Sequence, residues 1–336
     1  MTQRADRLEI FTEIVENAGR EALKKAAEEI LNSKFSCGIV SSAAKYHAEF
    51  LDEVTPISQA LMALSCEVAG GEKGKTTNVA AAISILIEAS NVHDDIIDHT
   101  TTKYSRKTVF GKFGGDIALL VGDLFLAQGT MLLCKACQKL PKEQEKTILE
   151  TTFETLVKVS NSVALETGMR KNFGVTSQEY LKVIQLKASA PEAHCKIGGI
   201  LGNGSKRIIQ TLGQYGKTYG LLGNVTDEFL DLLNYDKLRG RVKNECLPLP
   251  ILLSLEDSRI KKDICTLIKD FYLTRKTKNQ IIKMVLGSEK VQRLQKDIVS
   301  LAEKEVEQMK NYKESDAVVN LITLINTVKE VLWSIS

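Results

Sequence analysis

Two clusters of acidic residues have the types and spacing needed to bind divalent cations. In the run His-Asp-Asp-Ile-Ile-Asp, Asp94 and Asp98 are separated by one helical turn, and Asp95 lies between them. In the run Asp-Glu-Phe-Leu-Asp, Asp227 and Asp231 repeat the same spacing. Side chains at positions i and i+4 leave the same face of a helix. Each cluster should therefore present two carboxylates together.

The position of these clusters favours a metal-binding role over a structural one. Each stands at the carboxyl-terminal end of a strongly apolar helical run, 79–92 for the first cluster and 215–226 for the second. Helix C-termini disfavour negative charge and crowded carboxylates repel one another, so each cluster costs stability unless cations neutralise it. Carboxylate oxygens favour Mg²⁺, which often binds one or two carboxylates together with substrate phosphate oxygens. A solvated helix end is the alternative for either cluster alone, but two clusters of one design disfavour it.

Helical periodicity covers almost the whole chain and predicts the elements that position the clusters. Apolar residues recur every three or four positions, and no convincing alternation of β-branched residues interrupts them. The predicted helical ranges are 5–31, 57–69, 78–98, 115–138, 145–168, 177–188, 192–202, 206–233, 258–271 and 290–333. The chain has only five prolines, which leaves long stretches free for helices. The sequence predicts one all-α domain, residues 1–336, with ten or more helices.

Composition bounds the functions that this chain can have. It has 336 residues, with 45 basic and 42 acidic side chains and a net charge of +3, so charge gives no case for nucleic-acid binding. No apolar run approaches the length of a membrane span, and 79–87 is the best candidate. Seven dispersed cysteines and a charged N-terminus without a signal peptide predict a reduced, cytoplasmic location.

The two clusters and their surroundings resemble the trans-prenyl diphosphate synthases, which include farnesyl, geranylgeranyl and longer polyprenyl diphosphate synthases. The family motif Asp-Asp-x-x-Asp is present at 94–98, and its second acidic motif is matched at 227–231, with Glu228 replacing the second aspartate. Segments 108–124 and 248–253 also resemble the family. The resemblance extends over about residues 45–300, and the two motifs are specific in combination.

The resemblance implies an isoprenoid-synthase fold, a bundle of helices around a deep central cavity. It also implies a dimer, either of two identical chains or with a related subunit. In this family both motifs hold Mg²⁺, which draws off the diphosphate of an allylic prenyl diphosphate. The double bond of isopentenyl diphosphate then attacks the allylic cation. The apolar cavity keeps water away from that cation.

Matching positions carry the family's metal sites onto this chain. The resemblance implies that Asp94 and Asp98 are metal ligands, supported by Asp95. Asp227 and Asp231 would hold a further metal ion. Asp94, Asp98 and Asp227 are the expected catalytic carboxylates.

Four polar residues match positions that bind substrate in the family. Lys103 falls on the first arginine of an Arg-Arg pair, and Lys187 falls on the lysine of a Lys-Thr pair. Arg241 falls near a diphosphate-binding lysine, and Asn224 replaces a glutamine before the second motif. The alternative for each basic residue is a solvated surface charge.

The departures from the family concentrate at the site that binds isopentenyl diphosphate. Of the motif Gly-Gly-Lys-x-x-Arg-Pro only Pro56 is kept, and Asp52 and Thr55 replace the lysine and the arginine. Ile87 replaces a histidine, and Tyr104 replaces the second arginine of the Arg-Arg pair. A carboxylate in place of an ammonium group repels a diphosphate. We therefore expect isopentenyl diphosphate to bind weakly, if it is a co-substrate at all.

These residues leave three functions open. The favoured one is a Mg²⁺-dependent prenyltransferase that acts on an allylic prenyl diphosphate. The second is a terpene-synthase-like enzyme whose cation is quenched by water, by cyclisation or by another nucleophile. The third is a non-catalytic subunit of a heteromeric prenyl synthase, which the intact acidic motifs disfavour.

Small residues before the first cluster bear on the length of the prenyl tail. Ala89 and Ser90 lie one turn before Asp94, where an aromatic residue in the family forms the floor of the cavity at farnesyl length. A tail that runs along this helix would meet these side chains first. We therefore expect room for geranylgeranyl length or longer. The alternative is that both residues merely allow close helix packing.

Overall fold

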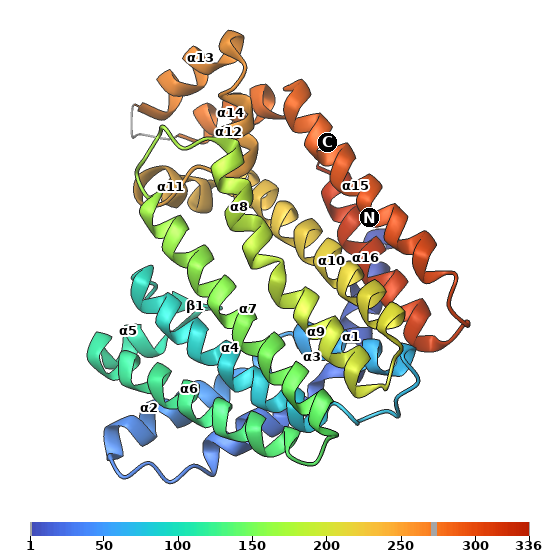
Figure 1. Ribbon diagram of the computed structural model, residues 1–336. Coiled ribbons are helices and arrows are strands. Elements are labelled where there is room, and N and C mark those ends of the chain that lie inside the picture. Colours follow the sequence, from blue (N-terminus) through green and yellow to red (C-terminus); the bar gives the residue numbers. More distant parts are fainter. Residues whose placement is uncertain (1, 270–273, 336) are drawn as a thin grey trace. The chain divides into compact units, whose positions relative to one another are not determined.

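The structure of the protein is a computed structural model that describes residues 2–269 and 274–335. Helices make up most of it (Figure 1). The elements up to the middle of the chain are α1 (Thr2–Leu31), α2 (Gly38–Ala48), the 3-10 helix η1 (Glu49–Glu53), α3 (Ile57–Val68), α4 (Thr77–Ile97), β1 (Thr102–Lys103), β2 (Arg106–Lys107), α5 (Val109–Phe113), α6 (Gly115–Cys137) and α7 (Lys142–Gly168). The remaining elements are α8 (Ser177–Lys187), α9 (Ser189–Leu201), α10 (Lys206–Leu233), α11 (Tyr235–Asn244), α12 (Leu249–Ser254), α13 (Ser258–Lys269), α14 (Arg275–Leu286), α15 (Glu289–Met309) and α16 (Asp316–Trp333).

The predicted all-α fold class is confirmed, and most long helices begin and end within three residues of their predicted bounds. The predicted range 290–333 is divided into α15 and α16, and the last two residues of the predicted helix 258–271 lie outside the described residues. Periodicity missed the shorter helices α2, α5, α11, α12 and α14, because few turns give a weak apolar pattern.

A two-stranded hairpin follows α4 and was also missed. Strands β1 and β2 pair antiparallel, with Thr102 opposite Lys107. The turn residues Tyr104 and Ser105 have φ angles of 49° and 63°, as a tight two-residue hairpin turn requires. Strands of two residues show no alternation, and Tyr-Ser is not a typical sequence for such a turn.

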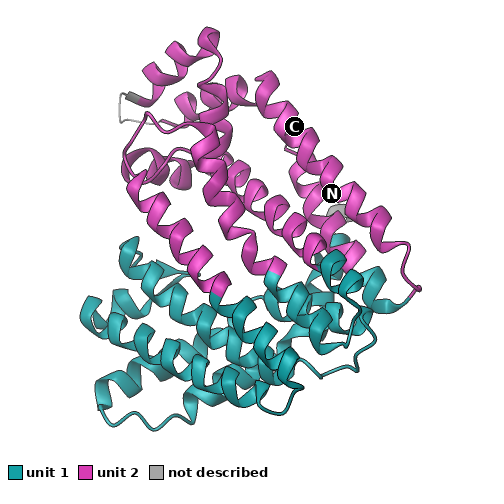
Figure 2. Cartoon of the chain, in the orientation of Figure 1, with its two compact units in different colours: residues 1–153, 193–212, 315–320 teal, residues 154–192, 213–314, 321–336 magenta. Residues whose placement is uncertain are grey.

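The chain divides into two compact units (Figure 2). Unit 1 comprises residues 1–153, 193–212 and 315–320, and unit 2 comprises residues 154–192, 213–314 and 321–336. The first acidic cluster lies in unit 1 and the second lies in unit 2. The predicted extent of a single domain over 1–336 stays a prediction.

The core of unit 1 is centred on α4. Helix α4 packs against α6, α1 and α3. Two glycines of α6 permit its close approach to α4, because a Cβ at Gly122 would lie 2.3 Å from His93 Nε2 and one at Gly129 would lie 2.8 Å from Leu86 Cδ2. This packing fixes the end of α4, where the first acidic cluster begins.

In unit 2, α12 packs against α8, α14 and α15. Pro250 lies in the first turn of α12, where a missing N–H costs no helical hydrogen bond. Tyr180 on α8, Phe229 on α10 and Leu249 on α12 are fully buried or nearly so. These helices hold the end of α10, which carries the second acidic cluster.

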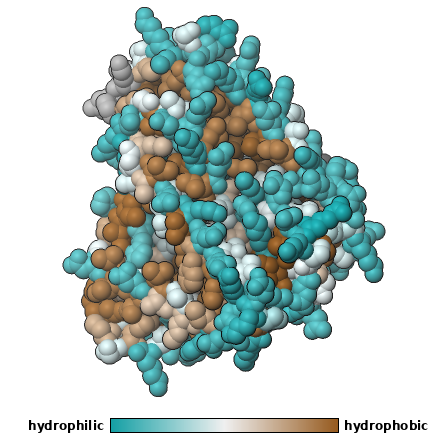
Figure 3. Space-filling model, viewed as in Figure 1, coloured by the Kyte–Doolittle hydropathy of each residue, from teal (hydrophilic) through white to brown (hydrophobic). Residues whose placement is uncertain are grey.

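Helix α6 is apolar along much of its length. Among the described residues, its 23-residue span is the one whose length and composition would suit a membrane crossing, and a third of its apolar window is buried. By itself this is weak support for a membrane segment. The helix itself was predicted at 115–138, but its span-like apolar length was not, because Asp116 and Asp123 interrupt the apolar run. Figure 3 shows apolar side chains at the surface over the region of α6.

Candidate active site

The first acidic cluster ends α4. The amide of Asp98, the residue after the helix, donates to the Asp94 carbonyl oxygen at 2.8 Å, so Asp94 and Asp98 keep helical spacing. Asp94 is half-buried and Asp98 is exposed, whereas Asp95 is buried. The end of α4 thus carries two carboxylates that reach solvent and one that is buried, and their roles as metal ligands and support stay predictions.

The hairpin after α4 brings a lysine to the buried member of this cluster. Lys103 Nζ lies 2.7 Å from Asp95 Oδ1. Burial raises the pKa of Asp95, and the ammonium group of Lys103 only partly offsets that rise. Burial opposes the charged form of Lys103, but Asp95, Asp94 and Asp98 raise its pKa above the ordinary value. Lys103 is therefore held as a cation beside the first cluster, where the sequence predicted a substrate-binding group.

The second acidic cluster ends α10, and a buried arginine from α11 neutralises two of its members. Arg241 is 6% exposed. Its Nη1 donates to Asp231 Oδ2 at 2.9 Å, and its Nη2 donates to Glu228 Oε2 at 3.1 Å. Its Nε donates to the carbonyl oxygen of Cys246 at 2.7 Å. These bonds fix the loop after α11 to the end of α10.

Glu228 also connects the cluster to neighbouring helices. Its Oε2 accepts a hydrogen bond from the amide of Leu249 at 2.8 Å, which satisfies a backbone donor at the start of α12. Tyr180 from α8 lies with its hydroxyl 2.9 Å from Glu228 Oε1 and 2.7 Å from Arg241 Nη2. The extra methylene of glutamate explains how this position reaches partners that an aspartate side chain would not.

A second ion pair continues this network on α7 and α8. The Tyr180 hydroxyl lies 2.9 Å from Glu166 Oε1, and Lys187 Nζ donates to Glu166 Oε2 at 2.6 Å. Burial and the nearby carboxylates raise the pKa of Tyr180 well above its usual range, so its hydroxyl remains a donor. Although burial opposes it, Lys187 holds the pKa of Glu166 below its usual value. Lys187 is therefore anchored beside the second cluster.

Within the second cluster, Asp227 is the carboxylate whose pKa is raised. Partial desolvation, followed by repulsion from Asp231 and Glu228, raises its pKa to about 6. Its side chain nevertheless remains exposed, so solvent screens part of this repulsion. A carboxylate in this position gains stability when a cation binds. The oxygen donors of both clusters fit Mg²⁺ chemically, although the described residues contain no group of three or more His, Cys, Asp or Glu side chains close enough to hold a metal ion.

Three other predicted site residues make local contacts. Asn224 donates from Nδ2 to the Gly220 carbonyl oxygen at 2.8 Å. Ser90 is half-buried and donates its hydroxyl to the Leu86 carbonyl oxygen, whereas Ala89 is 2% exposed and belongs to the core of unit 1. Ala89 thus contributes to helix packing. The substrate and tail-binding roles of these residues stay predictions.

Sequence reasoning missed Tyr180 and Glu166, which organise the second cluster, and the pair of His47 and Glu88 beside the first. His47 Nε2 lies 2.8 Å from Glu88 Oε2, and both side chains are buried. No local signal could have revealed these partners, because they are distant in sequence and only the fold brings them together.

Comparisons with known proteins identify the family of this chain. The sequence profile of the family named Polyprenyl synthetase matches residues 56–288, more than half of the chain. A short chain isoprenyl diphosphate synthase from Methanothermobacter thermautotrophicus is 31% identical over 186 residues, which are 55% of this chain and 56% of that protein. A geranylgeranyl diphosphate synthase from Sulfolobus acidocaldarius is 25% identical over 73% of this chain and 71% of that protein.

The chain thus matches little more than half the length of the first of these relatives. Among solved structures, a geranylgeranyl pyrophosphate synthetase from Pyrococcus horikoshii superposes with a TM-score of 0.82 and 23% identity, over 96% of this chain and 98% of that one. A decaprenyl diphosphate synthase from Rhodobacter capsulatus gives a TM-score of 0.76 at 16% identity, over 98% of each chain. At these identities the structures show a shared fold. Together with the matched profile, they establish that this chain belongs to the polyprenyl synthetase family.

Proposed function

We propose that this chain is a Mg²⁺-dependent prenyltransferase that acts on an allylic prenyl diphosphate of geranylgeranyl length or longer. The observation that carries the proposal is the pair of acidic clusters at the ends of α4 and α10, in a chain of the polyprenyl synthetase family. The relatives named geranylgeranyl diphosphate synthase support the tail length. The seven free thiols fit a reduced, cytoplasmic location.

The residues of each unit have distinct tasks in this proposal. Asp94 and Asp98 bind Mg²⁺ in unit 1, and Asp227 binds it in unit 2 with Asp231 beside it. When bound, Mg²⁺ supplies the positive charge that stabilises the departing diphosphate. Lys103 adds a cation at the first cluster. Arg241 neutralises carboxylates of the second cluster that would otherwise repel the substrate.

The test uses radiolabelled isopentenyl diphosphate, geranylgeranyl diphosphate and Mg²⁺, with the protein alone and with a related synthase subunit. Elongation supports a prenyl synthase. Diphosphate release without elongation supports the terpene-synthase-like alternative, which the loss of family residues at Asp52, Thr55 and Tyr104 favours. A protein that is silent alone but changes the products of its partner would be a non-catalytic subunit. Silence in every condition would contradict all three.

The tail-length proposal predicts that Ser90→Phe impairs binding of long substrates. A phenyl ring on this face of α4 should raise the KM for geranylgeranyl diphosphate about tenfold, the size of a steric conflict of 1–3 kcal/mol. Farnesyl diphosphate should be less affected. Steady-state kinetics with both substrates measure the effect, and Ser90→Ala is the control without added bulk. Unchanged kinetics with the longer substrate would show that the tail does not follow this face.

We further propose that α6 forms the interface with a second copy of the chain. The helix leaves four large apolar side chains about half exposed, namely Leu119, Leu120, Leu126 and Met131. Such a stripe on a single helix is typical of an interface between subunits. A related subunit of the same family is the alternative occupant.

The expected result is that Leu120→Glu with Met131→Glu converts a dimer into a monomer. Introducing two carboxylates into an apolar interface leaves them desolvated and unpaired. Sedimentation velocity measures the oligomeric state. The matched control is Leu8→Glu, which changes an exposed leucine on α1. A monomeric parent protein that dimerises only with a related subunit would identify the alternative occupant.

A further inference from the structure

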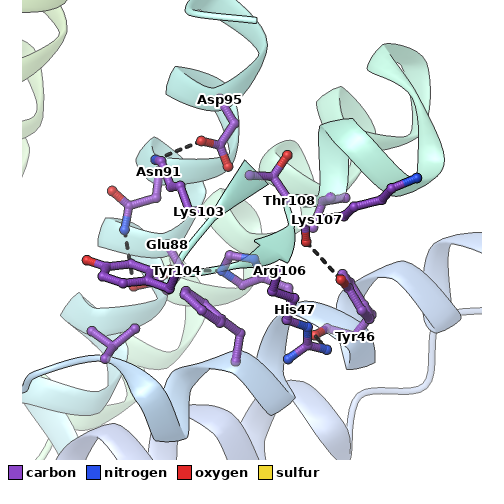
Figure 4. Close-up of a pocket in the computed structure, with 13 residues that line it drawn as sticks. Tyr46, His47, Glu88, Asn91, Asp95, Lys103, Tyr104, Arg106, Lys107 and Thr108 are labelled. Atoms are coloured by element: carbon purple, nitrogen blue, oxygen red, sulfur yellow. Dashed lines mark hydrogen bonds and ion pairs between the residues drawn. The ribbon is translucent and has the colours of Figure 1, made fainter. Parts of the chain in front are cut away.

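A pocket in unit 1 adjoins the first acidic cluster (Figure 4). It lies between α2, the face of α4 before the cluster, and the hairpin of β1 and β2. Helix α4 contributes Glu88, Asn91 and Asp95, which share one face at helical spacing. Because Asp95 belongs to the first cluster, a molecule in this pocket would lie beside a substrate held by Asp94 and Asp98.

The inner wall of the pocket is a buried histidine–glutamate pair. His47 Nε2 lies 2.8 Å from Glu88 Oε2, and the side chains are 10% and 5% exposed. Asn91 Nδ2 donates to Glu88 Oε1 at 3.2 Å, so both oxygens of this carboxylate have partners. The Phe125 ring packs against the His47 ring, with 5.4 Å between the two ring centroids. A carboxylate that orients an imidazole in this way prepares it to accept a proton from a bound molecule.

Two of the three cations that line the pocket are engaged by protein groups, so the pocket is poorly suited to a second diphosphate. Lys103 pairs with Asp95 at 2.7 Å. Arg106 donates to the Tyr46 carbonyl oxygen at 3.0 Å and lies 4.0 Å above the Tyr46 ring. Lys107 adds one exposed ammonium group at the rim. A diphosphate would meet the carboxylates of Glu88 and Asp95, and each like charge opposes its binding.

The mouth of the pocket is aromatic. Tyr46, Phe50 and Tyr104 line it, and the rings of Phe50 and Tyr104 lie 5.5 Å apart. Tyr104 stands at the hairpin turn and is 73% exposed. Aromatic walls around a polar inner end suit a molecule with an apolar body and one polar group.

We infer that this pocket binds an uncharged prenyl acceptor that carries a hydroxyl group, with the hydroxyl directed to His47 and Glu88. This inference rests on the proposed function, and it names the class of the second substrate. The C–O bond between the prenyl group and the diphosphate breaks, and the diphosphate leaves with the electron pair. A lone pair of the acceptor oxygen forms the new C–O bond. The hydroxyl proton passes to the imidazole nitrogen that does not face Glu88, and the carboxylate stabilises the resulting imidazolium.

The test compares two acceptors that differ only in the diphosphate group. The protein is incubated with Mg²⁺, radiolabelled geranylgeranyl diphosphate and either isopentenyl diphosphate or its uncharged counterpart, 3-methylbut-3-en-1-ol. Benzyl alcohol serves as an aromatic probe. We expect a prenyl ether from at least one alcohol and no elongation by isopentenyl diphosphate. Elongation that exceeds ether formation, or no ether from either alcohol at saturation, would overturn the inference.

Variants test whether the acceptor binds and reacts in this pocket. Glu88→Gln removes the carboxylate that orients His47 and should lower kcat for ether formation about 100-fold, the low end of what a general base contributes. The control Glu150→Gln, an exposed position on α7, should retain full activity. If Glu88→Gln proves unstable, Tyr104→Ala removes an exposed ring, and we expect a higher KM for benzyl alcohol at unchanged kcat. Equal ether formation in the parent and both pocket variants would place the acceptor elsewhere.

The same assay separates this inference from the proposed function. Release of diphosphate from geranylgeranyl diphosphate with Mg²⁺ and water alone reports ionisation of the allylic substrate. If diphosphate is released neither with water alone nor with any acceptor, the proposed function is wrong. If release occurs and isopentenyl diphosphate is the better acceptor, only the inference about this pocket is wrong.

Discussion

Replacement of Asp94 or of Asp227 by alanine should lower the rate of diphosphate release about a thousandfold. Each change removes a carboxylate proposed to hold Mg²⁺. A bound metal ion contributes several kcal/mol to stabilisation of the leaving group, and about 1.4 kcal/mol corresponds to each factor of ten. Release of labelled diphosphate under single-turnover conditions measures the effect. Isothermal titration with Mg²⁺ and inorganic diphosphate should show a parallel loss of binding.

Matched controls separate metal binding from general effects of charge removal. Glu150→Ala in unit 1 and Asp297→Ala in unit 2 remove exposed carboxylates that belong to neither cluster, and both should leave the rate unchanged. Parent-like turnover in Asp94→Ala would show that the first cluster is not the metal site. Parent-like turnover in Asp227→Ala would show that the second cluster does not bind the metal.

Asp227→Ala should also raise thermal stability in metal-free buffer, in a pH-dependent way. Its pKa of about 6 in the folded protein exceeds that of an unfolded aspartate, because of desolvation and the charges of Asp231 and Glu228. The folded state therefore binds more protons between pH 4 and 6, and stability falls as pH rises through that window. The variant should melt above the parent at pH 7.5, and the difference should vanish below pH 4. A constant difference at every pH would contradict this origin.

The sequence predicted features that depend on one helix and missed those that depend on several. The long helices and the paired carboxylates Asp94 with Asp98 and Asp227 with Asp231 follow from the spacing of residues on a single element. Helix α2 was missed, because its buried stripe consists of one valine, three alanines and a histidine, which give a weak apolar pattern. With α2 unrecognised, nothing indicated that His47 would contact Glu88.

The second cluster shows the same limit. Glu228 could be recognised only as a replacement for an aspartate, and Arg241 only as a cation near a family position. Their hydrogen bonds to each other and to Tyr180 depend on how α8, α10 and α11 pack, and Tyr180 and Arg241 are 61 residues apart in the chain. A residue matched by position can therefore have an additional contact that the match does not reveal. Because Arg241 makes these buried contacts, the free energy of unfolding tests its role more directly than activity does.

Replacement of Arg241 by methionine should destabilise the protein by about 3–5 kcal/mol. The change removes a buried guanidinium and leaves the carboxylates of Glu228 and Asp231 without that partner. Breaking one side of a buried ion pair costs this much because the remaining charge stays desolvated. Urea unfolding followed by circular dichroism measures the free energy of unfolding. Arg259→Met is the control, since the Arg259 side chain that pairs with Asp257 is 76% exposed and its loss should leave that free energy nearly unchanged.

A second substitution identifies the cause of the destabilisation. In the Arg241→Met background, Glu228→Gln removes the stranded charge and keeps an oxygen that can accept from the Leu249 amide. It should therefore restore part of the lost free energy, whereas Glu228→Gln alone should destabilise the parent protein. If Arg241→Met instead unfolds like the parent but binds allylic diphosphate more weakly, Arg241 acts directly on the substrate. The ion pairs at the end of α10 would then contribute little to stability, and the role implied by the family match would be the correct one.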